Sequence, residues 1–196
     1  TFFDKKQTIH SLAEVNMGIN YVMLISSNSG LWRYNIGDTI EFTSIDPYKI
    51  IVTGRIKHFI SAFGEHVIVS EVEQSLKEAI DQEKSNIRVK EFTVAPEINP
   101  KIGLPYHEWF IEFDNPPLDI KGFSKKINRA LQNKNIYYND LIEGNVLRSL
   151  VIREVRKNGF NDYMKSIGKL GGQNKIPRLS DNRKIANILK DFTIKR

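Results

Sequence analysis

Short apolar runs separated by turn-forming residues fill the first part of the chain. Tyr21–Ile25 and Lys49–Thr53 are two such runs, and Thr39–Phe42 alternates apolar and polar residues with a period of two. That period is typical of a strand with one buried face. Turns are predicted where Gly, Asn, Asp and Pro gather between the runs, at 28–30, 35–38 and 46–47. The pattern predicts a small antiparallel β subdomain over residues 1–55.

After Gly54 the spacing of apolar residues becomes that of helices alternating with strands. The capping-box sequence Ser70–Glu73 predicts the start of a helix. The apolar face of this helix is expected to consist of Val72, Leu76, Ala79 and Ile80. His107–Phe113 then alternates like a strand, which the prolines after Asn115 end because proline cannot donate to a ladder.

Three further helices and one further strand are predicted in the rest of the chain. The helices carry apolar residues at helical spacing, at 123–131, 160–167 and 185–189. Ser180 is the expected N-cap region of the last helix, and Val146–Val155 is the expected strand. The predicted fold class is therefore α+β, with a mixed-sheet α+β C-terminal domain over residues 56–196.

Composition excludes few function classes. The 196 residues are 40% hydrophobic and 27% charged, as in an ordinary soluble globular protein, and no apolar run approaches a membrane span. The chain has no cysteine, which excludes disulfides and thiolate metal sites. We expect a cytoplasmic protein. Because the first residue is Thr1 and not Met, we also expect a fragment of a longer chain.

Positive charge is concentrated at the C-terminal end. Residues 165–196 hold nine Lys/Arg and two Asp, a net charge of +7 within a total of +6. Such a tail suggests an anionic partner, such as a phosphate, a nucleic acid or an acidic protein surface, and is equally compatible with a solvated basic helix. A nucleic-acid module needs aromatic side chains among its cations, and this tail offers only Phe192.

Three segments can carry chemistry. In Leu31–Asp38 (Leu-Trp-Arg-Tyr-Asn-Ile-Gly-Asp), a carboxylate at a glycine turn can accept hydrogen bonds from ribose hydroxyls, although plain turn chemistry also explains it. Gly54–Glu73 has glycines suited to a joint and a tight turn; its alternative is a linker and hairpin with Glu65 on the surface. Gly171–Arg178 presents Lys175, a compact charge on a flexible stem, or is an ordinary basic loop.

Taken in order, these segments resemble the last three signature motifs of the adenylate-forming superfamily. Their wording, together with His-Glu-Trp at 107–109 and Gly-Lys-Leu-Gly-Gly-Gln-Asn-Lys-Ile-Pro-Arg-Leu-Ser at 168–180, is most similar to bacterial relatives of the auxin-responsive acyl-acid-amido synthetases. Plant members of that family join hormone acids to amino acids. The resemblance extends from about Ile9 to Leu189.

The resemblance implies the C-terminal fragment of an ATP-dependent acid–amino acid ligase, which first adenylates a carboxylic acid and then forms an amide. Lys175 would be catalytic at the α-phosphate and the carboxylate, and Gly54 and Lys57 would form a hinge to a mobile domain. Nucleotide binding would fall to Tyr34, Asp38, Arg55 and Arg178. ATP and Mg²⁺ would be required, with the metal on phosphates and not on ligands from this chain. The partners would be a small carboxylic acid and an amino acid, with no membrane and no specific nucleic acid.

Two departures and one absence qualify the resemblance. His58 stands where the superfamily often has an acidic residue, and the loop before Lys175 is Gly-Gly-Gln-Asn and not a Ser-Gly pair. Both favour the amido-synthetase branch over the alternative of an acyl-CoA-type ligase. The chain lacks a Ser/Thr/Gly-rich phosphate loop. We therefore expect it to be inactive alone. His107–Trp109 is either a strand that faces the amine acceptor or a plain strand. The alternative function for the chain is a basic binding module.

Overall fold

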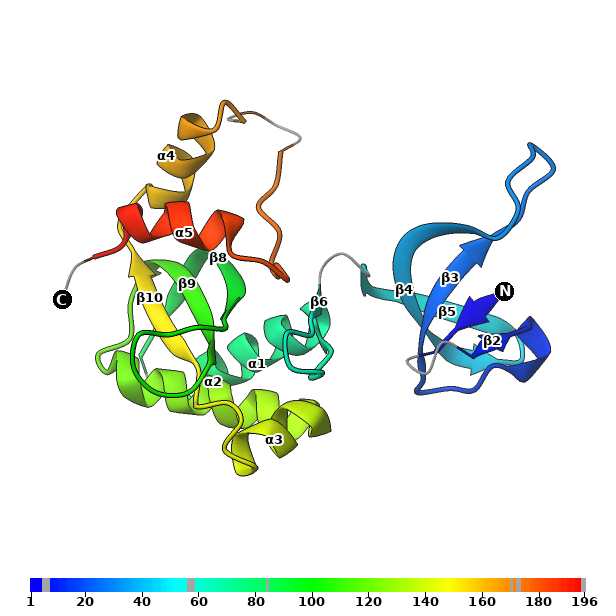
Figure 1. Ribbon diagram of the computed structural model, residues 1–196, viewed down its shortest axis with the longest axis horizontal. Helices are drawn as coiled ribbons and strands as arrows, with labels where there is room; N and C mark the ends of the chain where they lie inside the picture. The colour runs from blue at the N-terminus through cyan, green and yellow to red at the C-terminus, as the bar shows by residue number, and fades with distance from the viewer. Residues whose placement is uncertain (5–7, 56–58, 84, 170, 172–173, 195–196) are drawn as a thin grey trace. The chain divides into compact units, whose positions relative to one another are not determined.

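The computed structural model describes residues 1–4, 8–55, 59–83, 85–169, 171 and 174–194 (Figure 1). Internal contacts divide the chain into two compact units. The N-terminal unit is Thr1–His58 with Ile68–Ser70, and the C-terminal unit is Phe59–Val67 with Glu71–Arg196. Each unit is described by itself below.

The N-terminal unit is built on one antiparallel sheet with the strand order β2-β1-β3-β4-β5. The strands are β1 (Phe2–Phe3), β2 (Ile9–His10), β3 (Asn20–Ile25), β4 (Tyr34–Ile45) and β5 (Tyr48–Arg55). A short 3₁₀ helix, η1 (Leu12–Glu14), precedes β3. This sheet confirms the predicted small antiparallel β subdomain.

Aromatic side chains form the core of this unit. Phe2, Tyr21 and Phe42 meet edge to face, with ring centroids 5.2–6.2 Å apart. Ile40 and Val15 complete the buried cluster. Edge-to-face contacts align the positive edge of one ring with the negative face of the next. They therefore fix the orientation of these rings in addition to burying apolar area.

The C-terminal unit has a three-stranded mixed sheet in the order β10-β9-β8. β8 (Arg88–Glu97) is antiparallel to β9 (Tyr106–Asn115), which is parallel to β10 (Val151–Val155). A separate two-stranded sheet joins β6 (Phe59–Ile60) to β7 (Val67–Ile68), with Gly64 at a φ of 90° in the connection between them. Gly64 lies in a bend of this connection, and glycine suits its positive φ because other residues resist that conformation.

Helices cover both faces of the mixed sheet, with α4 and α5 on one side and α1, α2 and α3 on the other (Figure 1). Their bounds are α1 (Val69–Asp81), α2 (Ile120–Lys134), α3 (Ile136–Glu143), α4 (Gly159–Ser166) and α5 (Lys184–Leu189), followed by the 3₁₀ helix η2 (Lys190–Phe192). Phe110 of β9 packs with Phe160 of α4 and Leu189 of α5, while Phe113 contacts Phe123 of α2. The predicted mixed-sheet α+β fold is confirmed.

Several local predictions need correction. Helix α1 begins at Val69, so Ser70 lies inside its first turn and not before it. Ser180 does not cap α5, whose N-cap is Arg183, because the backbone of Ser180 is hydrogen-bonded to Val94 of β8. Strand β10 is also shorter than predicted, starting only at Val151. Strand β8 and helix α3 carried no prediction.

In the part of the chain that the structure describes, no helix combines the length and the hydropathy needed to cross a bilayer.

Candidate functional site

Asp38 and Arg55 are brought together by strand pairing. Asp38 of β4 is the direct ladder partner of Arg55 of β5. The two residues are far apart in sequence, so only the register of this hairpin makes them neighbours. Arg55 is the last residue of the edge strand β5, and Asp38 lies opposite it on β4.

The segment from Asn35 to Asp38 forms a bulge of β4 against β3. The turn predicted at Asn35–Asp38 is wrong, because the chain continues as a strand with β5 paired to Asp38. The local turn chemistry is nevertheless present: Gly37 has a φ of 81°, and its N–H donates to Asn35 Oδ1 at 2.8 Å. Pairing with the neighbouring strands keeps this segment in the ladder, where it forms a bulge and not a loop. Such β-bulges occur near many functional sites.

Exposed aromatic side chains lie at the start of β4. Tyr34 is 54% exposed, and Trp32, just before the strand, is 81% exposed. Trp32 stands within the Leu31–Asp38 motif, but it is not among the residues that the sequence predicts for the site. An apolar ring this exposed has its face available for a planar ligand.

The predicted hinge residues have unequal support. Gly54 lies inside β5 opposite Thr39, outside the left-handed region of φ. The backbone conformation of Gly54 is therefore one that other residues also adopt, and it does not use the conformational freedom of glycine that suggested a joint. Lys57 lies outside the described residues, and its hinge role stays a prediction.

Glu65 is buried, contrary to its placement on the surface in the linker interpretation. It and His107 of β9 are both fully buried, and His107 Nε2 donates to Glu65 Oε1 at 2.9 Å. The backbone N–H of Phe63 donates to Glu65 Oε2 at 2.8 Å. Burial raises the pKa of the Glu65 carboxyl, but the hydrogen bond from His107 and nearby amides outweigh burial and hold this pKa below its ordinary value. The pair fastens the β6–β7 hairpin to the mixed sheet.

The ring of Tyr138 from α3 packs against His107, with centroids 5.0 Å apart. Its hydroxyl donates to Asn128 Oδ1 at 2.7 Å, and the same oxygen accepts from the N–H of Leu150 at 3.1 Å. His107 is thus enclosed within the unit. This enclosure favours a structural role for His107 over contact with an amine acceptor.

Lys175 is exposed, and the chain just after it is anchored. The segment Pro177–Ser180 lies along β8 and forms a parallel bridge through Leu179 and Val94. Val94 N–H donates to Arg178 O at 3.0 Å, Ser180 N–H donates to Val94 O at 2.9 Å, and Thr93 Oγ1 donates to Pro177 O at 2.7 Å. An exposed cation is therefore presented beside a fixed piece of backbone.

Arg178 has protein partners. Its guanidinium pairs with Glu91, lies 3.5 Å from Glu73 Oε1, and donates to Phe92 O at 3.2 Å. The guanidinium carbon is also 4.6 Å from the centre of the Phe92 ring. That Arg178 binds nucleotide stays a prediction. In the structure its guanidinium contacts acids and Phe92 of its own unit.

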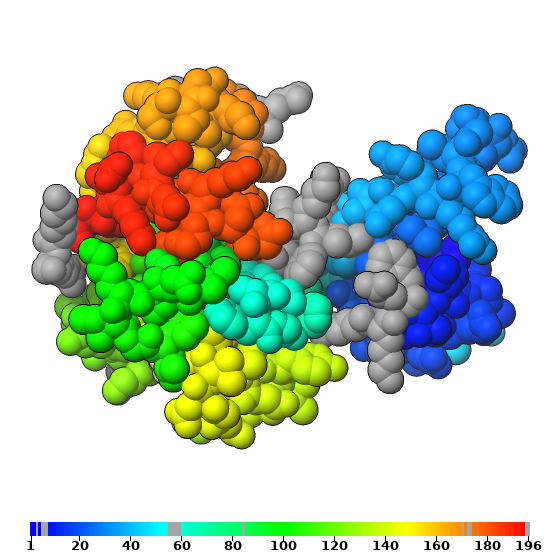
Figure 2. Space-filling view, in the orientation of Figure 1, coloured from blue at the N-terminus to red at the C-terminus, as the bar shows by residue number. Residues whose placement is uncertain are grey.

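Part of the basic C-terminal tail is neutralised within the unit itself. Arg183 Nη2 lies 2.6 Å from Glu108 Oε2 and 3.0 Å from Glu97 Oε2, and Lys190 Nζ is 3.2 Å from the same Glu97 oxygen. Burial raises the pKa of Glu108, but hydrogen bonds from Arg153 and Arg183 outweigh it and hold the pKa low. Figure 2 shows the α5 end of this tail (red) beside the part of the chain coloured green. These pairs account within the protein for part of the tail's charge.

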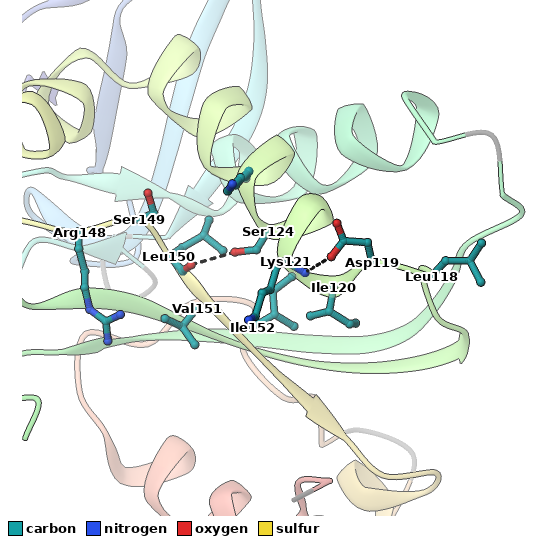
Figure 3. A pocket seen from close by; sticks show the side chains of 11 residues that line it. Leu118, Asp119, Ile120, Lys121, Ser124, Arg148, Ser149, Leu150, Val151 and Ile152 are labelled. Carbon is teal, nitrogen blue, oxygen red and sulfur yellow. Dashed lines mark hydrogen bonds between the residues drawn. The ribbon is translucent and has the colours of Figure 1, made fainter. Parts of the chain in front are cut away.

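A depression of about 650 Å³ lies between the N-terminal turn of α2 and the start of β10 (Figure 3). Its walls combine apolar side chains such as Ile120 and Val151 with the cations Lys121, Lys125 and Arg148. Ser124 Oγ closes one side by donating to Leu150 O at 2.9 Å. None of the predicted site residues lines it.

The described residues contain no group of three or more His, Asp or Glu side chains arranged to hold a metal ion.

Comparison with known proteins identifies relatives for both units. The family model described as the GH3 family central domain matches residues 2–55, and the GH3 family C-terminal domain matches residues 67–184. The Arabidopsis thaliana indole-3-acetic acid-amido synthetase GH3.10 is 24% identical over 94% of this chain and 32% of its own length.

Solved structures agree on the fold. A structure of GH3.15 acyl acid amido synthetase matches with a TM-score of 0.73 at 18% identity, over 99% of this chain and 37% of that one. A structure of AtGH3.15 acyl acid amido synthetase in complex with 2,4-DB gives 0.71 at 17% identity, over 99% and 36%. The chain therefore spans about a third of the length of these relatives.

Proposed function

The chain belongs to the GH3 family, and we propose that it is the C-terminal part of an ATP-dependent ligase that joins a carboxylic acid to an amino acid. The observation that carries the proposal is the pairing of Asp38 with Arg55 at a bulged strand, followed in the chain by an exposed Lys175 beside an anchored segment. A carboxylate suits the ribose hydroxyls, and the two cations suit the phosphates and the charge that builds at the reacting centre.

Two half-reactions follow from this assignment. In the first, a carboxylate oxygen of the acid attacks the α-phosphorus of ATP, which forms the acyl adenylate and releases pyrophosphate. In the second, the amine attacks the acyl carbon, which forms the amide and releases AMP. The likeness to amido synthetases supports an amine acceptor, and a thioester-forming ligase would share only the first step.

Each proposed residue contributes a different interaction. Asp38 accepts hydrogen bonds from the ribose hydroxyls, and Tyr34 and Arg55 contact the nucleotide nearby. Lys175 donates to the α-phosphate and the acid carboxylate as negative charge builds in the transition state, where an interaction accelerates chemistry. Mg²⁺ is assigned to the phosphates of ATP, where it would neutralise charge. No step here depends on metal ligands from this chain.

Domain movement separates the half-reactions in this proposal. Rotation about Gly54 and Lys57 would carry Lys175 away after adenylation, as a lid does, and would let the amine approach. The proposal also implies that the 196 residues alone do not make an acyl adenylate, because the phosphate loop and the acid pocket would belong to the rest of the protein.

The test is Lys175→Ala in the full-length protein, with Lys184→Ala as the control. Both lysines are exposed, and both substitutions remove one charge. Loss of one preorganised transition-state contact costs about 2.7–4 kcal/mol, or about a hundred- to a thousandfold in rate. We expect lost adenylation and retained amide formation from synthetic adenylate in Lys175→Ala, with a near-normal control. Equal, mild defects in both variants would contradict the proposal.

A competition between amine and thiol acceptors on the preformed adenylate separates an amido synthetase from an acyl-CoA-type ligase. A basic nucleic-acid module has less support, because Arg178, Arg183 and Lys190 are paired with acids of their own unit. DNA binding is expected to be weak, without sequence preference, and lost on adding salt.

A further inference from the structure

Docking of the segment Pro177–Ser180 on β8 restricts where Lys175 can be. Two residues of chain span at most about 7 Å, so the anchor at Pro177 limits the backbone of Lys175 to a small volume. The bridge between Leu179 and Val94 and the hydrogen bond from Thr93 to Pro177 O define that anchor. Leu179 is fully buried, which adds apolar contact to the backbone hydrogen bonds.

The side chain of Arg178 reinforces this anchor. It reaches Phe92 O, the Phe92 ring and the Glu91 carboxylate, all on β8. Glu91 is itself oriented, because its Oε1 accepts from the Phe92 N–H at 3.0 Å. The Phe92 ring in turn lies nearly parallel to that of the fully buried Trp109, with an interplanar angle of 11°. A planar guanidinium can satisfy such a set of partners at once, which an ammonium cannot.

Lys175 and Arg178 are therefore unlike one another. Among the described residues, Lys175 is exposed and forms no ion pair, whereas the charge of Arg178 is matched by Glu91 and Glu73. Arg178 would have to leave these acids before it could serve a phosphate.

We propose that Arg178 is a positioning residue: it clamps the Lys175 segment to β8 through Glu91 and Phe92, and does not bind the nucleotide. This role rests on the proposed function only in that Lys175 is taken as catalytic. The clamp makes Lys175 move with the C-terminal unit as one body, so that rotation of the unit delivers and withdraws the lysine.

The experiment compares Glu91→Gln, Arg178→Gln and the double variant in the full-length protein. If Arg178 acts through Glu91, each single variant misplaces Lys175 and lowers kcat of adenylation by about tenfold, since small misplacements are costly, with KM for ATP changed by less than about twofold. The double variant should be no worse than Arg178→Gln, because that substitution already removes the interaction with Glu91. A charge swap, Glu91→Arg with Arg178→Glu, should recover part of the rate.

Arg156→Gln is a matched control. Arg156 also pairs with an acid, Asp162 at 2.8 Å, and lies over a phenyl ring, that of Phe192 at 5.4 Å, but at a different place in the same unit. We expect its adenylation rate to be near normal. A loss equal to that of Glu91→Gln would mean that any such contact matters only for stability, and would overturn the clamp.

Hydrogen exchange of the Val94 and Ser180 amides tests the clamp without activity, since both amides donate across the docked segment. Faster exchange in Glu91→Gln and Arg178→Gln, but not in Arg156→Gln, is the expected result, and it holds even if the full-length protein proves not to adenylate. Unchanged exchange and rate in Glu91→Gln, with a raised KM for ATP in Arg178→Gln, would show that Arg178 binds nucleotide and that the clamp is wrong.

Discussion

Strands β5 and β9 reverse the usual relation between polarity and burial. In β5, three consecutive apolar side chains are substantially exposed: Ile50 at 46%, Ile51 at 50% and Val52 at 66%. In β9, three polar or charged side chains are at most 1% exposed: His107, Glu108 and Glu112. Both segments were predicted to be strands, so their secondary structure does not explain the difference.

Position in the sheet explains it. β5 is an edge strand of its sheet, whereas β9 is the central strand of a sheet with helices on both sides (Figure 1). Each buried acid of β9 has partners: Glu112 accepts from Lys90 Nζ at 2.8 Å and from the N–H groups of Asn158 and Phe160 at the start of α4. Buried charge is tolerated where it is paired and hydrogen-bonded, while single exposed apolar residues cost little.

The largest loss of stability is expected from truncating a buried core side chain of β9. Phe110→Ala should destabilise the C-terminal unit by about 3–5 kcal/mol, because Phe110 is fully buried among helices α4 and α5. The measurement is urea unfolding followed by fluorescence in a Trp32→Phe background. Trp109 is then the sole tryptophan and lies in this unit. A loss below about 1 kcal/mol would contradict the packing described.

A somewhat smaller effect is expected from removing one partner of the buried pair. His107→Leu leaves the Glu65 carboxylate with fewer hydrogen bonds, which should cost about 2–3 kcal/mol at neutral pH. The double variant with Glu65→Gln should recover about 1 kcal/mol or more, because no charge then stays buried. The same fluorescence assay measures both, and a double variant no more stable than the single one would refute a charge penalty.

Lowering the pH should destabilise the C-terminal unit, which holds the buried acids, more than the N-terminal unit, which contains β5. The folded-state pKa values of Glu65 and Glu108 lie below the ordinary value of 4.5. Their contribution to stability is therefore complete above about pH 4.5 and is lost as pH falls from there through the lowered pKa values. Unfolding of the C-terminal unit measured from pH 7 to pH 3 should show this loss, and Glu65→Gln should reduce its slope. An unchanged slope would argue against the Glu65 assignment.

The smallest effect is expected at β5. Ile51→Thr should change the free energy of unfolding of the N-terminal unit by less than about 0.5 kcal/mol, since the side chain is already half in water and threonine suits a strand. Fluorescence of Trp32 in a Trp109→Phe background reports on this unit. A loss of 1 kcal/mol or more would show that the exposed apolar residues of β5 are packed.

Local sequence predicted elements whose causes lie within a few residues. The apolar runs at Tyr21–Ile25 and Lys49–Thr53 became β3 and β5, and the stop after Asn115 follows from two prolines. The bend at Gly64 follows from one glycine. The prediction at Asn35–Asp38 was wrong for an instructive reason: its turn chemistry is real, but neighbouring strands absorbed it into a bulge.

The sequence by itself determined the two-part α+β organisation, the order of the motifs and the exposed Lys175, because periodicity, turn chemistry and motif spacing act over short stretches of chain. Only the tertiary structure decided that Glu65 is buried against His107, 42 residues away, and that Arg178 is held on Phe92, 86 residues away. Burial and ion pairing depend on which distant residues a fold brings together, and a side chain's own polarity does not reveal its neighbours.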